Sequence, residues 1–184
     1  MGIEGAEGMF AKTGVNVKDL HPRLLNALKM ASTEYYRATG KQIGINSGYR
    51  DIKAQAELYR KSGGDGSAAK PGSSMHNFGL AVDIDSKQID EMEKLGLLAK
   101  YGLTRPIRGE TWHLELANVD RRGIRMAAAK AGLDGSNAGK TQQVAMASQP
   151  GIRGVKGLES EDPNWKVKAS APSVNNSGSM SPPP

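Results

Sequence analysis

Two short stretches that alternate apolar and polar residues constrain the fold most, because they place candidate metal ligands on strands. Residues 80–85 read Leu-Ala-Val-Asp-Ile-Asp, and residues 112–116 read Trp-His-Leu-Glu-Leu. A period of two is typical of strands that bury one face. On the second strand the residues expected on the buried face are Trp112, Leu114 and Leu116. The polar faces then carry Asp83 and His113, and these two side chains converge if the strands are neighbours.

The residue types in these stretches suit a zinc site. The chain has three histidines and no cysteine, so His, Asp and Glu are the available ligands. His76, Asp83 and His113 supply two imidazoles and one carboxylate, a set that leaves one zinc position open for water. Glu110, three residues before His113, is placed to act as general base. Arg50 follows a Ser-Gly-Tyr turn and is expected to stabilise the oxyanion of a scissile carbonyl.

Each of these residues also has a plainer interpretation when it is taken alone. A single histidine beside a strand is more often a structural hydrogen-bonding group than a ligand, and Asp83 or Arg50 alone is more often a solvated surface charge. Glu115 is either exposed or a hydrogen-bond partner of a ligand imidazole. His21, next to Pro22, is interpreted as local structure at a helix start. The combined pattern is much more specific than any of its parts.

The remaining sequence predicts helices and strands around this site. One helix is expected to begin near Pro22 and to end at Gly40. Three more helices are expected over roughly 52–61, 87–99 and 118–132. A third strand is expected at 43–46, and residues 62–74 consist of turn-forming types that suit the rim of a cleft. Residues 1–17 are interpreted as a flexible arm, residues 18–132 as the folded domain, and residues 133–184 as a disordered or partner-ordered tail rich in Gly, Ser and Pro.

Charge and hydropathy exclude several classes of protein. The formal net charge is +6, and nine Lys and Arg against five Asp and Glu lie from residue 120 onward, so most of the excess belongs to the C-terminal part. The basic residues there are scattered and lack interleaved aromatics, which argues against specific nucleic-acid binding. No apolar run approaches the ~20 residues of a membrane span. The N-terminus has no Sec-type signal, so work outside a cytoplasm would require another route.

The motifs resemble those of the M15 peptidases. The resemblance covers about residues 18–117 and is carried by three motifs in order: Ser-Gly-Tyr-Arg at 47–50, Ser-x-His-x-x-Gly-x-Ala-x-Asp at 74–83, and Glu-x-Trp-His at 110–113. It implies a small α+β domain with a mainly antiparallel sheet flanked by helices. It also implies Zn²⁺ on His76, Asp83 and His113, with Glu110 as the base and Arg50 stabilising the transition state. Two further positions match residues near the substrate, Ser74 and Gln55.

The same resemblance implies a peptidoglycan peptidase acting on stem peptides. The stretch 74–83 is especially similar to phage L-alanyl-D-glutamate endolysins, which favours an endolysin or a virion-associated lysin. The tail would then bind phage structural proteins. The protein would be located in a host cytoplasm with later release to the cell wall, or in a virion. The alternative within enzymes is a D-alanyl-D-alanine carboxypeptidase, because metal, base and arginine act on the scissile amide whichever bond it is. An alternative of another class is a non-catalytic structural or wall-binding component of a phage particle.

Overall fold

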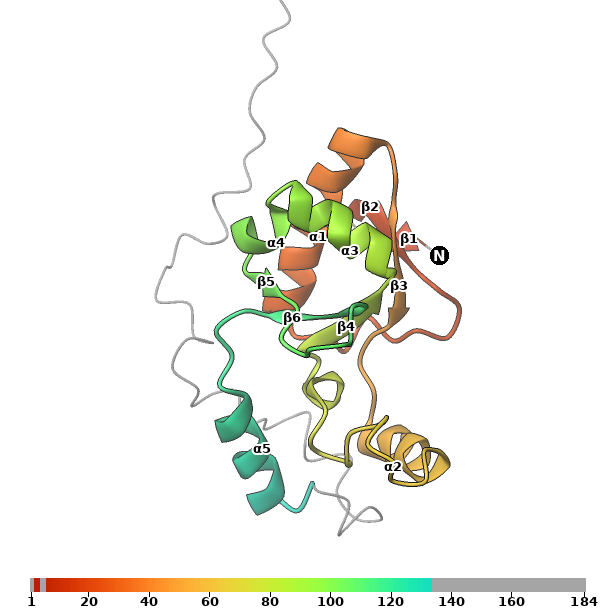
Figure 1. Ribbon diagram of the computed structural model, residues 1–184, viewed down its shortest axis with the longest axis vertical. Helices are drawn as coiled ribbons and strands as arrows, with labels where there is room; N and C mark the ends of the chain where they lie inside the picture. The colour runs from red at the N-terminus through yellow and green to blue at the C-terminus, as the bar shows by residue number, and fades with distance from the viewer. Residues whose placement is uncertain (1, 4–5, 134–184) are drawn as a thin grey trace, which may run out of the picture.

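A six-stranded sheet runs through the part of the chain that the computed structural model describes, residues 2–3 and 6–133 (Figure 1). The strand order is β1-β2-β3-β4-β6-β5, and the parallel pair is β2 with β3 while the other pairs are antiparallel. The strands are β1 Gly2–Ile3, β2 Ala6–Ala11, β3 Ile43–Ser47, β4 Ala81–Ile84, β5 Leu103–Thr104 and β6 His113–Leu116. The prediction of an α+β domain with a mainly antiparallel sheet is therefore confirmed.

Helices lie on two sides of the central strands. They are α1 Pro22–Thr39, α2 Ile52–Lys61, the short 3-10 helix η1 Met75–Phe78, α3 Ser86–Lys94, α4 Leu97–Lys100 and α5 Arg121–Lys130. In Figure 1, α1, α3 and α4 gather on one side of β4 and β6, whereas α2, η1 and α5 lie on the other. None of the helices in the described part combines the length and apolarity needed to cross a membrane.

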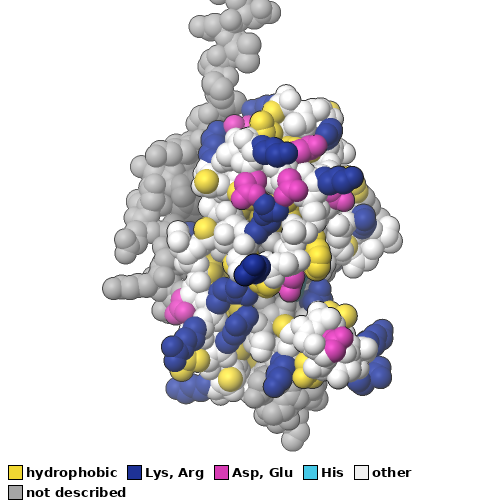
Figure 2. Space-filling model, in the orientation of Figure 1, with side chains coloured by type: hydrophobic (Ala, Val, Ile, Leu, Met, Phe, Trp, Pro, Cys, Tyr) yellow, Lys and Arg dark blue, Asp and Glu magenta, His cyan; other side chains and the backbone are white. Residues whose placement is uncertain are grey.

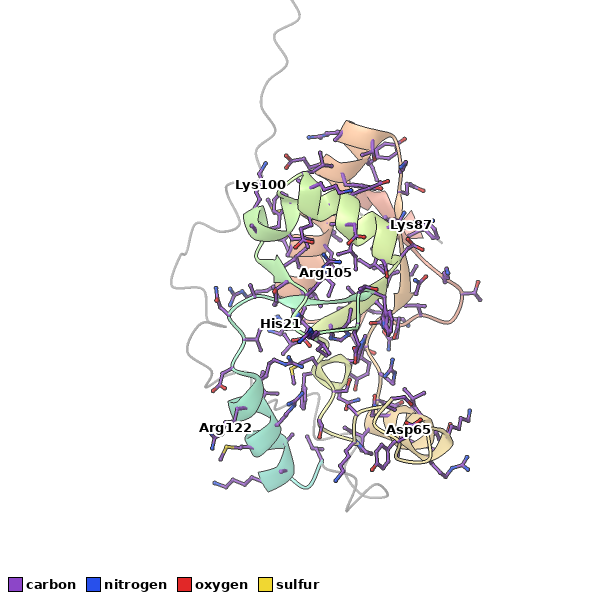
Figure 3. All side chains as sticks on the ribbon, in the orientation of Figure 1. His21, Asp65, Lys87, Lys100, Arg105 and Arg122 are labelled. Carbon is purple, nitrogen blue, oxygen red and sulfur yellow. The ribbon has the colours of Figure 1, made fainter. Side chains whose placement is uncertain are left out.

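Helix α1 begins and ends at residues with clear local reasons. Pro22 occupies the first turn, where its missing N–H costs nothing, and the His21 side chain caps the helix by accepting from the Arg23 amide at 3.2 Å. Gly40 ends it in the left-handed conformation with φ 70°. His21, labelled in Figure 3, is thus a structural residue, and burial and nearby Arg23 lower its pKa. The predicted helix and this local role of His21 are confirmed.

The expectation of a flexible arm over residues 1–17 is wrong for its described part. Strand β2 pairs with β3, and Met9 is fully buried in the core. Gly8 explains why the composition misled: an added Cβ there would lie 2.0 Å from the carbonyl oxygen of Ser32 in α1. The glycine permits strand and helix backbones to approach closely, so it marks dense packing and not mobility.

Strand β6 is buried on both faces, which differs from the expected alternation. His113 is 4% exposed and Glu115 is 2% exposed, because the His76 ring packs against His113 and Arg121 of α5 contacts Glu115. Trp112 was expected on the buried face but is 46% exposed, because it precedes the strand. Its carbonyl still accepts a hydrogen bond from the Ile84 amide.

Two other expectations meet different outcomes. The helix expected over 87–99 is divided into α3 and α4 at Gly96, which has φ 72°. The exposed side of α3 is held to the segment between β5 and β6 by ion pairs from Arg105, labelled in Figure 3, to Asp90 and Glu93. The tail predicted at 133–184 lies outside the described residues, apart from Leu133, which packs partly against the core.

Candidate metal centre

Three potential metal ligands converge where β4, β6 and η1 meet. Asp83 in β4 lies directly opposite His113 in β6, so the antiparallel register brings the two side chains together. His76 comes from η1, which ends at Gly79 just before β4 begins. One ligand atom from each of His76, Asp83 and His113 lies within 4.8 Å of the others. The two strands are neighbours, as the alternating patterns required.

The hydrogen bond of His76 to the backbone fixes which of its ring nitrogens is available. Its Nδ1 lies 2.8 Å from the carbonyl oxygen of Gly48, and a carbonyl only accepts, so Nδ1 carries the proton. Nε2 is therefore the ring nitrogen that remains for a metal, and it lies 3.3 Å from an Asp83 oxygen. His76 is only 3% exposed. The ring is therefore held with Nε2 directed at the shared centre before any metal arrives.

His113 is oriented by the opposite ring nitrogen. Its Nε2 donates to Glu115 Oε1 at 2.8 Å, and its Nδ1 faces Asp83 Oδ1 at 3.1 Å. Glu115 is therefore buried as the hydrogen-bond partner of the imidazole, which is one of the two interpretations of the sequence, and it is not an exposed carboxylate. Such carboxylate–histidine contacts orient ligand rings in metal sites.

The electrostatics of the cluster reflect two imidazoles that share one carboxylate. Burial alone raises the pKa of Asp83, but hydrogen bonds from His113 and His76 outweigh it and hold the pKa well below its usual range. Burial lowers the pKa of His113, whereas its bonds to Asp83 and Glu115 raise that pKa to about 9. The cluster as a whole therefore favours positive charge.

The donor set fits zinc. Zinc in catalytic sites takes three protein ligands of the His and carboxylate type and retains an open position. Two neutral imidazoles and one carboxylate leave net positive charge on Zn²⁺, which preserves its Lewis acidity. The predicted zinc cofactor is supported by this fit, with His76, Asp83 and His113 as the residues that would hold it.

Glu110 stands beside the cluster without being part of it. Its Oε2 lies 3.9 Å from His113 Nδ1, and its side chain is 40% exposed. A turn places it there, with the Glu110 carbonyl accepting from the His113 amide at 3.2 Å. A carboxylate that is adjacent to the ligand atoms yet open to solvent has the position that a general base requires.

Arg50 is fixed close to the cluster by two neighbours. Its guanidinium donates to Gln55 Oε1 at 2.8 Å and to Ser47 Oγ at 3.0 Å. Burial lowers its pKa, and the charge of Asp83 acts in the opposite direction. The backbone is fixed too: the Arg50 amide donates to the His76 carbonyl, and Asn77 Nδ2 donates to the Arg50 carbonyl at 2.7 Å.

Gln55 and Ser74 are both buried. Gln55 is 1% exposed and also donates to the Ala69 carbonyl at 2.7 Å, so it bridges Arg50 and the loop between α2 and η1. This geometry makes it a positioning residue for Arg50. Ser74, 8% exposed, precedes η1, and its carbonyl accepts from the Asn77 amide. A substrate contact for either residue stays a prediction.

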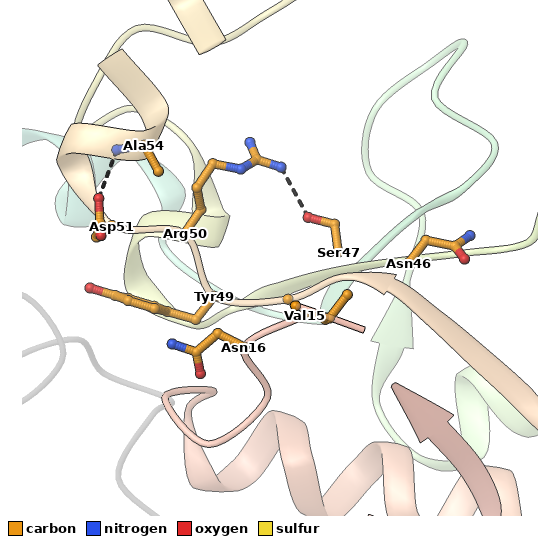
Figure 4. Close-up of a pocket in the computed structure, with 10 residues that line it drawn as sticks. Val15, Asn16, Asn46, Ser47, Tyr49, Arg50, Asp51 and Ala54 are labelled. Carbon is orange, nitrogen blue, oxygen red and sulfur yellow. Dashed lines mark hydrogen bonds between the residues drawn. The ribbon is translucent and has the colours of Figure 1, made fainter. Parts of the chain in front are cut away.

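A pocket of about 320 Å³ adjoins the cluster through Gly48 and Arg50 (Figure 4). Its other walls include the side chains of Asn16, Asn46 and Tyr49. Gly48 lets the residues before α1 approach this wall, because a Cβ there would lie 2.3 Å from the Asn16 carbonyl oxygen. The metal ligands themselves do not line the pocket, so it lies next to the chemical centre and not over it.

An α+β domain with one cluster of two histidines and an aspartate, flanked by a free carboxylate and a fixed arginine, has the site of a single-metal hydrolase. The comparisons agree. Residues 18–105 match the family model described as VanY: D-alanyl-D-alanine carboxypeptidase. Over these residues the chain is similar to the VanY-type peptidases. The match ends before Glu110 and His113. The sheet register pairs His113 with Asp83 of the matched part, and the turn before β6 places Glu110 beside His113.

Individual relatives are similar over part of their length. The chain is 37% identical over 79 residues to the peptidoglycan L-alanyl-D-glutamate endopeptidase CwlK of Bacillus subtilis (strain 168), which is 39% of this chain and 45% of that protein. The chain thus spans about half of this curated relative. The solved structure of the Serratia marcescens L-Ala D-Glu endopeptidase ChiX is similar with a TM-score of 0.41 and 18% identity, covering 59% of this chain and 90% of that one. The solved structure of a VanY D,D-pentapeptidase in complex with Zn(II) is similar with a TM-score of 0.41 and 24% identity. The match covers 65% of this chain and 79% of that one.

Sequence reasoning did not find the backbone or neighbouring groups that orient the ligands. The Gly48 carbonyl, the Asn77 amide and the Arg121 guanidinium each contact the site or its partners. A backbone carbonyl leaves no signal in side-chain types. For Arg121, the signal was available in principle, because Glu115 lies two residues from His113 on the same strand face and a buried carboxylate needs a cation nearby.

Proposed function

We propose that the chain is a zinc-dependent peptidase that hydrolyses peptide bonds of peptidoglycan, of the L-alanyl-D-glutamate endopeptidase type. The observation that carries the proposal is the convergence of His76, Asp83 and His113 with Glu110, whose carboxylate lies 3.9 Å from the ligand nitrogen of His113. The similarity to CwlK supports the endopeptidase specificity.

The residues have distinct roles in this reaction. Zinc bound at the three donors would supply Lewis-acid chemistry to a water and to the scissile carbonyl. Glu110 accepts the proton of the attacking water and returns it to the leaving amine, which its solvent-open position permits. Arg50, held by Ser47 and Gln55, places a fixed positive charge where the carbonyl oxygen becomes an oxyanion.

The surface near the site suits a substrate that carries carboxylates. Helix α5 contributes four basic side chains and no acidic one, and Figure 2 shows Lys and Arg gathered in the lower part of the view. Arg122, labelled in Figure 3, belongs to this helix. Stem peptides of peptidoglycan are short and anionic, so this positive surface favours their approach.

A D-alanyl-D-alanine carboxypeptidase is the second candidate, and the description of the matching family model favours it. Mass spectrometry of purified peptidoglycan after digestion separates the two. A new free amine on D-Glu supports endopeptidase action, and loss of terminal D-Ala alone supports carboxypeptidase action. Glu110→Gln is the matched control, and release of the same products by that variant would overturn the assigned chemistry.

A non-catalytic role is less consistent with the site. Structural zinc sites take four protein ligands, whereas three candidate ligands meet in the described residues and Glu110 stands free beside them. A phage setting, as an endolysin or virion-associated lysin with the residues after 133 binding phage proteins, remains our prediction. Co-purification of the protein with virus particles would test it.

A further inference from the structure

Glu115 is a buried carboxylate that the proposed reaction does not use directly. It is 2% exposed, and its Oε1 accepts from His113 Nε2 at 2.8 Å. A carboxylate in a buried site needs a cation close by.

Arg121 supplies that cation from a different element. It is the first residue of α5, and its Nη2 lies 3.4 Å from the same Oε1 of Glu115 that His113 contacts. Its Nε is buried and has no hydrogen-bond partner, so the guanidinium is not placed by a dense network of its own. In the described part of the chain, Arg121 forms its ion pair with Glu115.

The position of Arg121 in α5 is unfavourable for the helix itself. The first turn of a helix favours acidic side chains, because its free N–H groups carry partial positive charge. The first turn of α5 has no acidic residue and begins with Arg121 and Arg122, while Asp120 caps the helix through the Gly123 amide. Stabilisation of α5 therefore does not account for an arginine at position 121, whereas the adjacent buried carboxylate does.

We propose that Arg121 is a positioning residue for the metal site, acting through Glu115 on His113. Arg121 balances the charge of Glu115 and limits its motion, Glu115 holds His113 by Nε2, and Nδ1 stays directed at the metal position. The inference rests on the proposed zinc site. It extends the site from the sheet to α5, an element beyond the part of the chain that matches the family model.

The test is zinc affinity, measured by competition with a chromophoric chelator, for the full chain and for Arg121→Gln. Loss of a partner that orients a ligand weakens metal binding about 10-fold or more, and we expect a loss of that order. Arg122→Gln is the matched control, because it removes the same charge from the next, exposed residue of the same turn and should leave the affinity unchanged. Arg121→Lys should restore part of the affinity, and it serves as the test variant if Arg121→Gln does not fold.

A double-mutant cycle separates positioning from a general effect. In a Glu115→Gln background, which is itself weakened, Arg121→Gln should cause no further loss of zinc affinity. Equal losses in both backgrounds would overturn the pathway through Glu115, and equal affinity of Arg121→Gln and Arg122→Gln would overturn the role of Arg121. If the unmodified chain does not bind zinc, the proposed function fails instead, so the two failures are distinguishable.

Discussion

The metal-free protein should lose stability as the pH rises from about 6.5 to about 9, because His113 keeps its proton in the folded state across this interval. Burial lowers the pKa of His113, but its bonds to Asp83 and Glu115 raise it to about 9, from 6.5 in the unfolded chain. Below pH 6.5 both states hold the proton and the stabilisation is complete. Above that value the unfolded chain releases its proton first, so the free energy of unfolding falls until folded His113 also titrates.

The size of the effect follows from the difference between the two pKa values. A difference of about 2.5 units at 1.36 kcal/mol each corresponds to roughly 3 kcal/mol. For a domain of this size that is a fall in Tm of about 10 °C. The pKa of His21 is shifted downward, so its titration lies below this interval.

Thermal unfolding of chelator-treated protein, followed by circular dichroism at pH 6.5 and pH 9, measures this fall. His113→Gln should give a nearly constant Tm over the same interval. The Tm difference between zinc-loaded and metal-free protein should grow as the pH rises, because zinc displaces the proton of His113 more easily at higher pH. A metal-free Tm that stays constant or rises between the two pH values would refute the assigned hydrogen bonds of His113.

Three other changes test the site and the fold. Glu110→Gln should retain zinc while the cleavage rate falls about 10²–10⁴-fold; loss of zinc in metal analysis would make Glu110 a ligand instead. Gln55→Leu should release the Arg50 guanidinium and lower kcat about 10-fold with little change in KM, and an unchanged kcat in steady-state kinetics would contradict the positioning role. Gly8→Ala should destabilise the fold by about 1–3 kcal/mol, because the new methyl group meets the Ser32 carbonyl; an unaltered denaturant midpoint would mean that β2 does not pack there.

The sequence predicted the parts of the molecule that local chemistry decides. Period-two patterns located β4 and β6, and the helix expected over 52–61 is α2, which Asp51 caps by accepting from the Ala54 amide. The convergence of Asp83 and His113 was predictable because antiparallel neighbours with matching polar faces leave few registers. Long-range packing decides the remainder: which backbone approaches Gly8, and which helix covers the face that carries Glu115.

The segments around Arg50 and His76 are joined by two hydrogen bonds, so we expect substrate binding at Arg50 and metal binding at His76 to be coupled. The Arg50 amide donates to the His76 carbonyl, and the Gly48 carbonyl, two residues before Arg50, accepts from the His76 ring. Any shift that a substrate imposes on the arginine therefore reaches the imidazole through the backbone. Thermodynamic linkage makes this coupling reciprocal: if bound zinc raises the affinity for substrate by some factor, bound substrate raises the affinity for zinc by the same factor. Under the proposed function, positive coupling of this kind would hold the metal most tightly while the substrate is bound.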